Sequence, residues 1–170
     1  NDTKTEIYWS VGHPPEYQVD SLQLSVHREY MQTEQDVQTL LSLACELQLA
    51  LEPVIGHIVD YRVEKTTPVQ PEFHRNSQFL PERIRWANFW EAEMVQRLGG
   101  IDKVMESPAY EVRLCTNGSV LLLSTSSLLT YSNEEDAVCR QAIWEWLDLD
   151  QLHKEQSGIR EQELLRRRSP

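Results

Sequence analysis

The sequence predicts an α+β fold, a mostly antiparallel sheet with helices packed on one face in a single domain. Alternating apolar residues near the N-terminus indicate strands, as at Leu22, Leu24 and Val26. An Asn117-Gly118 dipeptide between two apolar runs is typical of a β-hairpin. Amphipathic helical patterns separate and follow these strands. The expected order is β-β-α-β, a loop, and then α-α-β-β-α.

The first third of the chain divides into two strands, a helix and a third strand. The segments Glu6–Val11 and Leu22–Glu29 are predicted strands, being rich in aromatic or alternating apolar residues. Thr33 has the position of a helix N-cap. The helix after it carries a stripe of apolar residues at helical spacing: Val37, Leu40, Leu41, Ala44, Leu47 and Leu51. The segment Val54–Glu64 alternates again and predicts a half-buried strand.

A second helix is predicted across the aromatic run that follows a long loop, Lys65–Pro81. Four residues would share one face of that helix: Ala87, Trp90, Met94 and Leu98. Trp86 and Phe89 would lie on a flanking stripe and are therefore candidate partner-binding residues. Gly99 would end the helix, and Ile101–Glu106 fits a further short one.

The hairpin prediction includes a register. Asn-Gly suits a type I′ turn, because both residue types tolerate positive φ. In that register Leu114 lies opposite Leu121, and Val112 lies opposite Leu123. Tyr110 would share their face, and we expect this face to belong to the core.

The last predicted helix carries the main candidate interface. Asn133 would cap it, and its predicted core face consists of Cys139, Ala142, Ile143, Trp146 and Leu147. Trp144 would project from the opposite face among carboxylates, as an aromatic anchor for a basic partner. The acids predicted to surround it are Glu134, Glu135, Asp136, Glu145 and Asp148. The alternative is that Trp144 packs under the C-terminal residues. Residues 154–170 would form a polar tail or a helical extension of the domain, which spans residues 1–153.

The composition indicates which class of partner the protein binds. The formal charge is −11 over 170 residues. Such a charge steers a protein toward cationic partners and disfavours nucleic acid or an anionic membrane, whose phosphates require Lys and Arg. Three widely spaced cysteines indicate small buried side chains in a reducing compartment, so a cytoplasmic protein is expected. No apolar run approaches the roughly 20 residues of a membrane-spanning helix.

Residues with catalytic potential are present but dispersed. The five histidines show no metal-binding spacing, and no common nucleotide or hydrolase motif occurs. We therefore expect no catalytic site, no metal and no cofactor. A hydrolase using His57 and Asp60 is the enzymatic alternative.

Three features together resemble small immunity proteins of bacterial polymorphic-toxin and type VI secretion systems. They are Y-W-x-x-G (Tyr8, Trp9, Gly12), the run from Trp86 to Gly100 followed by Ser107–Tyr110, and a hairpin leading to an acidic helix. Ser10-Val11 before Gly12 departs from the tighter spacing of the pattern. The resemblance implies stoichiometric neutralisation of a cognate secreted toxin, such as a nuclease of restriction-endonuclease-like type. An adaptor or loading chaperone for a secreted effector is the alternative, and homo-oligomerisation stays open.

Overall fold

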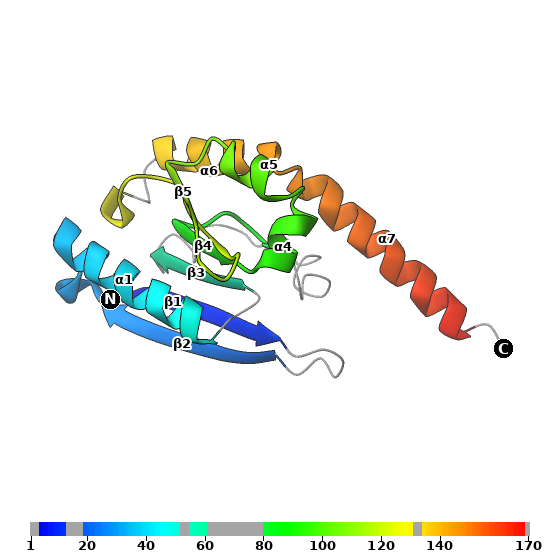
Figure 1. Cartoon of the computed structure of the whole chain (residues 1–170), viewed down its shortest axis with the longest axis horizontal. Coiled ribbons are helices and arrows are strands. Elements are labelled where there is room, and N and C mark those ends of the chain that lie inside the picture. The colour runs from blue at the N-terminus through cyan, green and yellow to red at the C-terminus, as the bar shows by residue number, and fades with distance from the viewer. Residues whose placement is uncertain (1–3, 13–18, 52–54, 61–79, 131–133, 169–170) are drawn as a thin grey trace.

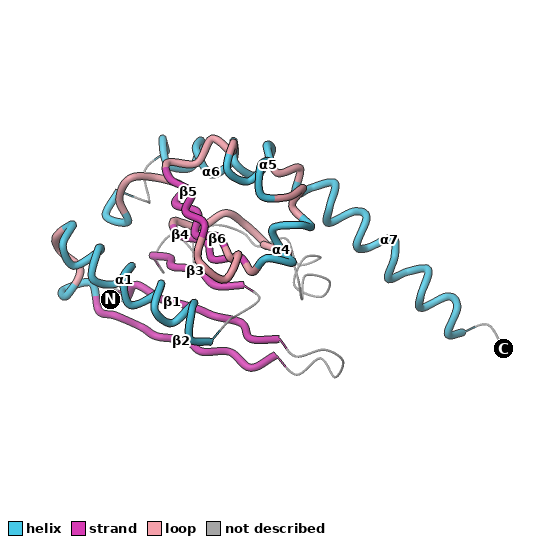
Figure 2. Tube along the Cα trace, in the orientation of Figure 1, coloured by secondary structure: helices cyan, strands magenta, loops and turns pink. Residues whose placement is uncertain are grey.

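The computed structural model describes residues 4–12, 19–51, 55–60, 80–130 and 134–168. Its strands are β1 (Lys4–Gly12), β2 (Val19–His27), β3 (Ile55–Asp60), β4 (Ala87–Trp90), β5 (Glu111–Leu114) and β6 (Val120–Leu123). Its helices are α1 (Glu34–Leu51), α4 (Ala92–Arg97), α5 (Ile101–Met105), α6 (Glu134–Trp146) and α7 (Leu149–Arg168), with short 3₁₀ turns η1 (Arg28–Tyr30) and η2 (Leu128–Thr130). The Lys65–Pro81 loop lies almost wholly outside the described residues, as does Asn133. Figure 2 shows the helices, strands and loops along the chain trace.

The six strands form one antiparallel sheet in the order β2-β1-β3-β4-β6-β5. The α+β class and the antiparallel sheet are thus confirmed. Helices cover both faces of the sheet, however, and not one. Successive residues of β6 alternate between two cores, with Leu121 and Leu123 in the one beneath α1 and Val120 and Leu122 in the other. The second core also contains buried residues of α4, α5 and α6. Figure 1 shows α1 and α6 on opposite sides of the sheet.

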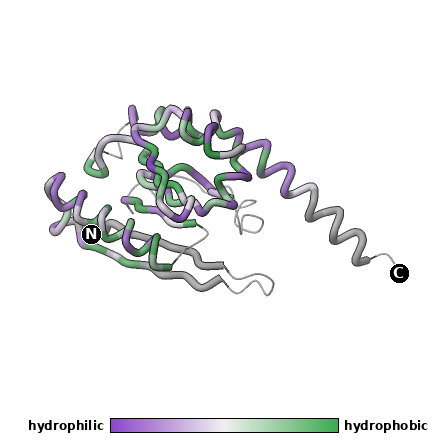
Figure 3. Tube along the Cα trace, in the orientation of Figure 1, coloured by the Kyte–Doolittle hydropathy of each residue, from purple (hydrophilic) through white to green (hydrophobic). Residues whose placement is uncertain are grey.

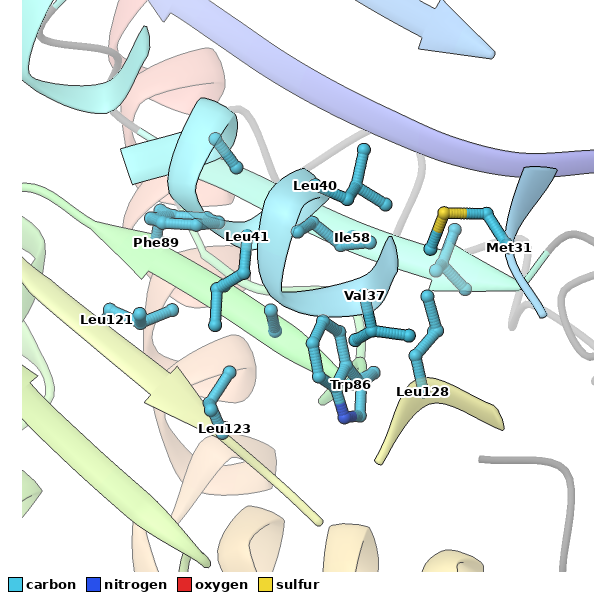
Figure 4. Packing of buried hydrophobic residues seen from close by; sticks show 13 residues of the cluster. Met31, Val37, Leu40, Leu41, Ile58, Trp86, Phe89, Leu121, Leu123 and Leu128 are labelled. Atoms are coloured by element: carbon cyan, nitrogen blue, oxygen red, sulfur yellow. The ribbon is translucent and has the colours of Figure 1, made fainter. Parts of the chain in front are cut away.

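Helix α1 forms as its cap predicts, and most of its predicted stripe is buried. Leu51 at its end is exposed, however, and Gln48 is buried instead. The Asp36 N–H donates to Thr33 Oγ1 (3.2 Å), and the Thr33 N–H donates back to Asp36 Oδ2 (2.8 Å). This reciprocal pair satisfies two backbone donors at the helix start. In Figure 4, Val37 lies toward Trp86 and Leu41 toward Phe89, so the stripe runs along the sheet from one end of the core to the other.

The prediction of a helix over the aromatic run is wrong for its first half. Residues Ala87–Trp90 form β4, hydrogen-bonded between β3 and β6, and the helix begins only at Ala92. All four residues of β4 are buried, because the strand is covered on both faces. A short apolar run of this kind does not distinguish a central strand from a buried helix by its period. Hydrogen bonding to β3 and β6 makes Ala87–Trp90 a strand and not a helix.

The β5–β6 hairpin exists, but its predicted register is wrong by one residue. Leu114 pairs with Val120 and Val112 with Leu122. Among described non-glycine residues only Asp148 has a positive φ, so Asn117 lacks the conformation that a type I′ turn needs. Instead Gly118 alone has a positive φ, of 81°, and closes a three-residue turn with a bulge. The slip leaves Leu114 59% exposed and Tyr110 63% exposed, so neither belongs to the core.

The C-terminal residues form the helical extension that was one of two expectations. Helix α7 begins at Leu149 and projects beyond the sheet (Figure 1). Its first turns are anchored, since Leu149 is buried in the second core and Leu152 packs against it. Mostly hydrophilic residues follow along the described part of the helix (Figure 3).

Candidate partner interface on helix α6

Helix α6 is held against the sheet by a narrow buried stripe. Ile143 and Leu147 have no exposed surface and lie in the second core. The helix ends where Asp148 adopts a φ of 56°, a left-handed conformation that Asp tolerates better than most residues. The Asp148 carbonyl then accepts hydrogen bonds from the N–H groups of Gln151 (3.1 Å) and Leu152 (3.1 Å), which starts α7. The chain therefore bends at Asp148, between α6 and α7.

Trp144 is part of this packing and does not project into solvent as predicted. It is half-buried and packs against the second core. Its ring stacks on that of His153, with centroids 5.7 Å apart and planes 12° from parallel. His153 is itself buried, with Nε2 3.0 Å from the Pro81 carbonyl oxygen. Trp144 thus helps to join α6, α7 and the segment before β4, which agrees with the alternative of packing under the C-terminal residues.

Trp146, and not Trp144, is the exposed tryptophan of α6. Its side chain is 45% exposed, although the sequence predicted it in the core. The side of α6 that faces the core lies nearer to Arg140 and Trp144 than the predicted core face does. The reason is that the bend at Asp148 brings His153 onto Trp144. Trp146 is therefore left at the flank. Its ring N–H donates to the Lys103 carbonyl oxygen of α5 (2.9 Å), which holds the exposed ring in one position.

Exposed residues on the side of α6 that carries Trp146, together with Met105 of α5, define a surface that we call the α6–α5 surface. It consists of Met105, Glu135, Val138, Cys139, Glu145 and Trp146. Cys139, Ala142 and Trp146 follow one line of the helix at spacings of three and four residues. Val138 is 68% exposed and Met105 is 45% exposed. Cys139 was expected in the core, and its exposure adds to this apolar strip.

Carboxylates surround the apolar strip. Of the predicted acids, Glu134, Glu135, Glu145 and Asp148 are exposed. Glu145 also accepts a hydrogen bond from the Gln141 amide (2.8 Å). Residues 134–150 contain six acidic residues and one basic residue, Arg140. The result is a strip of apolar side chains bordered by negative charge, which is the combination expected of a site for a basic protein partner.

Asp136 differs from the other predicted acids. It is half-buried, and burial raises the pKa of its carboxyl group, while a hydrogen bond with Thr130 and the charge of Arg140 oppose that rise. Its Oδ2 atom is shielded from solvent without a hydrogen-bond partner. Asp136 therefore faces η2 more than solvent, and contributes less than its neighbours to the exposed charge.

Two further predicted interface residues, Trp86 and Phe89, lie in the core. Neither has any exposed surface, and both belong to the cluster beneath α1 (Figure 4). Their selection rested on a helical face that does not form, since Phe89 is in β4. They cannot contact a partner from these positions without unfolding of the sheet.

The arrangement of His57 and Asp60 does not make a catalytic pair. Both lie in β3, three residues apart, and an odd separation in a strand places side chains on opposite faces. Burial holds the pKa of His57 well below 6.5, and the charges of Arg85 and Arg83 add to this. Among residues with described placement, no group of three His, Cys, Asp or Glu side chains is suited to hold a metal ion. No described helix combines the length and apolarity needed to cross a membrane.

Comparison of the chain with protein-family models, curated proteins and solved structures finds no match. The α6–α5 surface is therefore the feature of the described residues that bears on function.

Proposed function

We propose that this chain is a bacterial immunity protein that neutralises a cognate toxin by stoichiometric binding through the α6–α5 surface. The proposal rests on one observation, the half-exposed Trp146 on a helix whose exposed residues include Glu135 and Glu145. Tryptophan is enriched among residues that dominate binding energy. The hydrogen bond from its ring to Lys103 fixes it before binding, which reduces the entropy lost on association.

The charges suit a toxin domain that is basic. A nuclease toxin presents cationic groups to the phosphates of its substrate, and an acidic surface can shield those groups. The carboxylates of Glu135 and Glu145 would steer association, and the Trp146 ring would slow dissociation. Such an inhibitor acts in the cytoplasm of the producing cell and needs neither a catalytic residue nor a cofactor.

The experiment uses the product of the gene next to the one that encodes this chain. Cells expressing that product should survive only when this protein is co-expressed. Trp146→Ala should weaken binding by about 2–4 kcal/mol and reduce protection. Tyr30→Ala, which removes an aromatic side chain that is 68% exposed at η1, is the matched control and should leave protection unchanged.

Charge variants distinguish the effect of the carboxylates on the association rate from the effect of Trp146 on the dissociation rate. Glu135→Gln with Glu145→Gln should slow association and flatten its dependence on salt, with little change in dissociation. Full protection by folded Trp146→Ala protein would contradict the proposed site. Absence of protection by the wild type, together with altered export of the neighbouring product, would favour the adaptor or loading chaperone instead.

A further inference from the structure

Within the part of the chain that the structure describes, the sheet edge at β5 is open, which suggests a second interaction, independent of the α6–α5 surface. Strand β5 is the last in the strand order and has β6 as its hydrogen-bonded neighbour within the described sheet. Arg113 and Leu114 are exposed, Glu111 and Val112 are half-buried, and Tyr110 beside the strand is exposed. An exposed strand edge is a template on which another strand can pair.

The hairpin turn determines which backbone groups of β5 face outward. The Cys115 N–H donates to the Ser119 carbonyl (2.8 Å), and the Gly118 N–H donates to the Cys115 carbonyl (3.0 Å). Cys115 therefore directs its backbone groups inward, toward β6. Because inward and outward groups alternate along an antiparallel strand, Arg113 and Glu111 also bond inward. The N–H and C=O groups of Tyr110, Val112 and Leu114 consequently point away from the sheet.

A second copy of β5 could pair with this edge in an antiparallel register centred on Val112. Val112 would lie opposite its own copy, and Tyr110 would lie opposite Leu114 of the other chain, so that outward groups meet outward groups. Glu111 would then lie opposite Arg113 of the other chain, twice by symmetry. These charged residues would form the non-hydrogen-bonded pairs, whose Cα atoms approach to about 4.5 Å.

The neighbouring registers are unfavourable. A shift by one residue on one chain places backbone groups that point away from the sheet opposite backbone groups that already bond to β6. A shift by two places either Glu111 against Glu111 or Arg113 against Arg113, and like charges directly opposite each other destabilise a strand pair. Of these antiparallel alignments, only the one centred on Val112 satisfies the backbone and opposes unlike charges.

We propose that two copies of this protein associate through β5, in antiparallel register about Val112, to give one continuous sheet. Glu111 and Arg113 already pair within each strand through two hydrogen bonds, one of them from Nη2 to Oε2 (2.9 Å). In the dimer the four side chains form an alternating cluster of charges on the α1 face of the sheet. Tyr110 and Leu114 cover each other on the opposite face.

The association should be weak. Four residues on each side bury less than the roughly 1,200 Å² of a stable interface. The mass of the wild-type protein should therefore be measured by sedimentation equilibrium from about 1 µM to about 500 µM. It should rise with concentration from 19.9 kDa toward twice that value.

Charge exchange tests the register. Arg113→Glu places a second carboxylate opposite Glu111 of the other chain, and Glu111→Arg places two guanidinium groups opposite each other. Each variant alone should therefore remain monomeric throughout the concentration range. The double variant, Glu111→Arg with Arg113→Glu, restores opposite charges and should dimerise like the wild type. An equimolar mixture of the two single variants should form a heterodimer for the same reason.

A backbone variant separates edge pairing from side-chain attraction. Val112→Pro removes an outward N–H without removing a bond to β6, and proline is tolerated on edge strands in this orientation. It should remain monomeric with the hairpin intact, as judged by circular dichroism. A monomeric wild type at every concentration would overturn the proposal. So would folded single variants that dimerise as well as the wild type, or a folded double variant that fails to recover dimerisation.

Discussion

Helices α1 and α6 begin alike but bury very different amounts of apolar surface. Each has an acidic first turn with aspartate at its third position, Asp36 in α1 and Asp136 in α6. Helix α1 buries five side chains along its length: Val37, Leu40, Leu41, Ala44 and Gln48. In α6 only Ile143 is fully buried, while Val138, Cys139 and Trp146 are exposed. The apolar side chains of α1 thus serve mainly to pack the core. Helix α6 exposes apolar side chains that its own packing against the sheet does not use.

The largest expected effect is on α1. Leu41 is 1% exposed within the core, so Leu41→Ala should lower the free energy of unfolding by about 2–5 kcal/mol. Val138→Ala on α6 is the matched control and should change it by less than about 0.5 kcal/mol. Urea denaturation of both variants measures the difference. Equal losses would mean that Val138 is covered in solution and that the two helices do not differ in this respect.

The two tryptophans of α6 differ in burial within one helix. Trp144→Ala removes the stack on His153 and should lower the free energy of unfolding by about 2–3 kcal/mol. Trp146→Ala should cost about 1 kcal/mol, since its ring is half-exposed and loses one hydrogen bond. Thermal and urea denaturation would distinguish them. A larger loss for Trp146 would place it in the core, as the sequence predicted, and would remove the basis of the α6–α5 surface.

The cap of α1 should contribute less than either core. Thr33→Ala removes the acceptor of the Asp36 N–H and the hydroxyl that donates to Asp36 Oδ2 (2.7 Å). We expect a loss of about 1 kcal/mol in the free energy of unfolding. Thr33→Ser keeps the hydroxyl and should retain most of that stability. If both variants lose equally, the reciprocal hydrogen bonds are not what stabilises the start of the helix.

The two aspartates should give the smallest effects, with opposite dependence on pH. Hydrogen bonds from Thr33 lower the pKa of Asp36 below 3.8, so its stabilisation is present above that value and is lost as pH falls through the folded pKa. Burial raises the pKa of Asp136 above 3.8, so its contribution is greatest at lower pH and declines as pH rises through the folded pKa.

Melting temperatures from pH 2 to pH 7 test this difference. Relative to wild type, Asp36→Asn should become less stable as pH rises, and Asp136→Asn should become more stable. Parallel trends in the two variants would contradict the assigned environments.

Local interactions determined much of this protein from the sequence alone. Thr33 and Asp36 lie three residues apart and form their cap without help from distant residues, so the start of α1 was predictable. The positions of α1 and β2 follow from helix and strand periods, which one segment carries by itself. The acidic first turn of α6 was predictable for the same reason. The half-buried strand predicted over Val54–Glu64 is wrong in its burial, because β3 buries Ile58 and Val59 on opposite faces.

Only the tertiary structure decided the features that depend on distant partners. Residues Ala87–Trp90 became a strand because β3 and β6 pair with them on both sides. The β5–β6 register follows from a turn in which Asn117 does not have a positive φ. This register leaves Leu114 exposed. The roles of Trp144 and Trp146 were exchanged because the bend at Asp148 brings His153 onto Trp144. A helical period gives the relative angles of side chains, but the direction that faces the core is set by what packs against the helix.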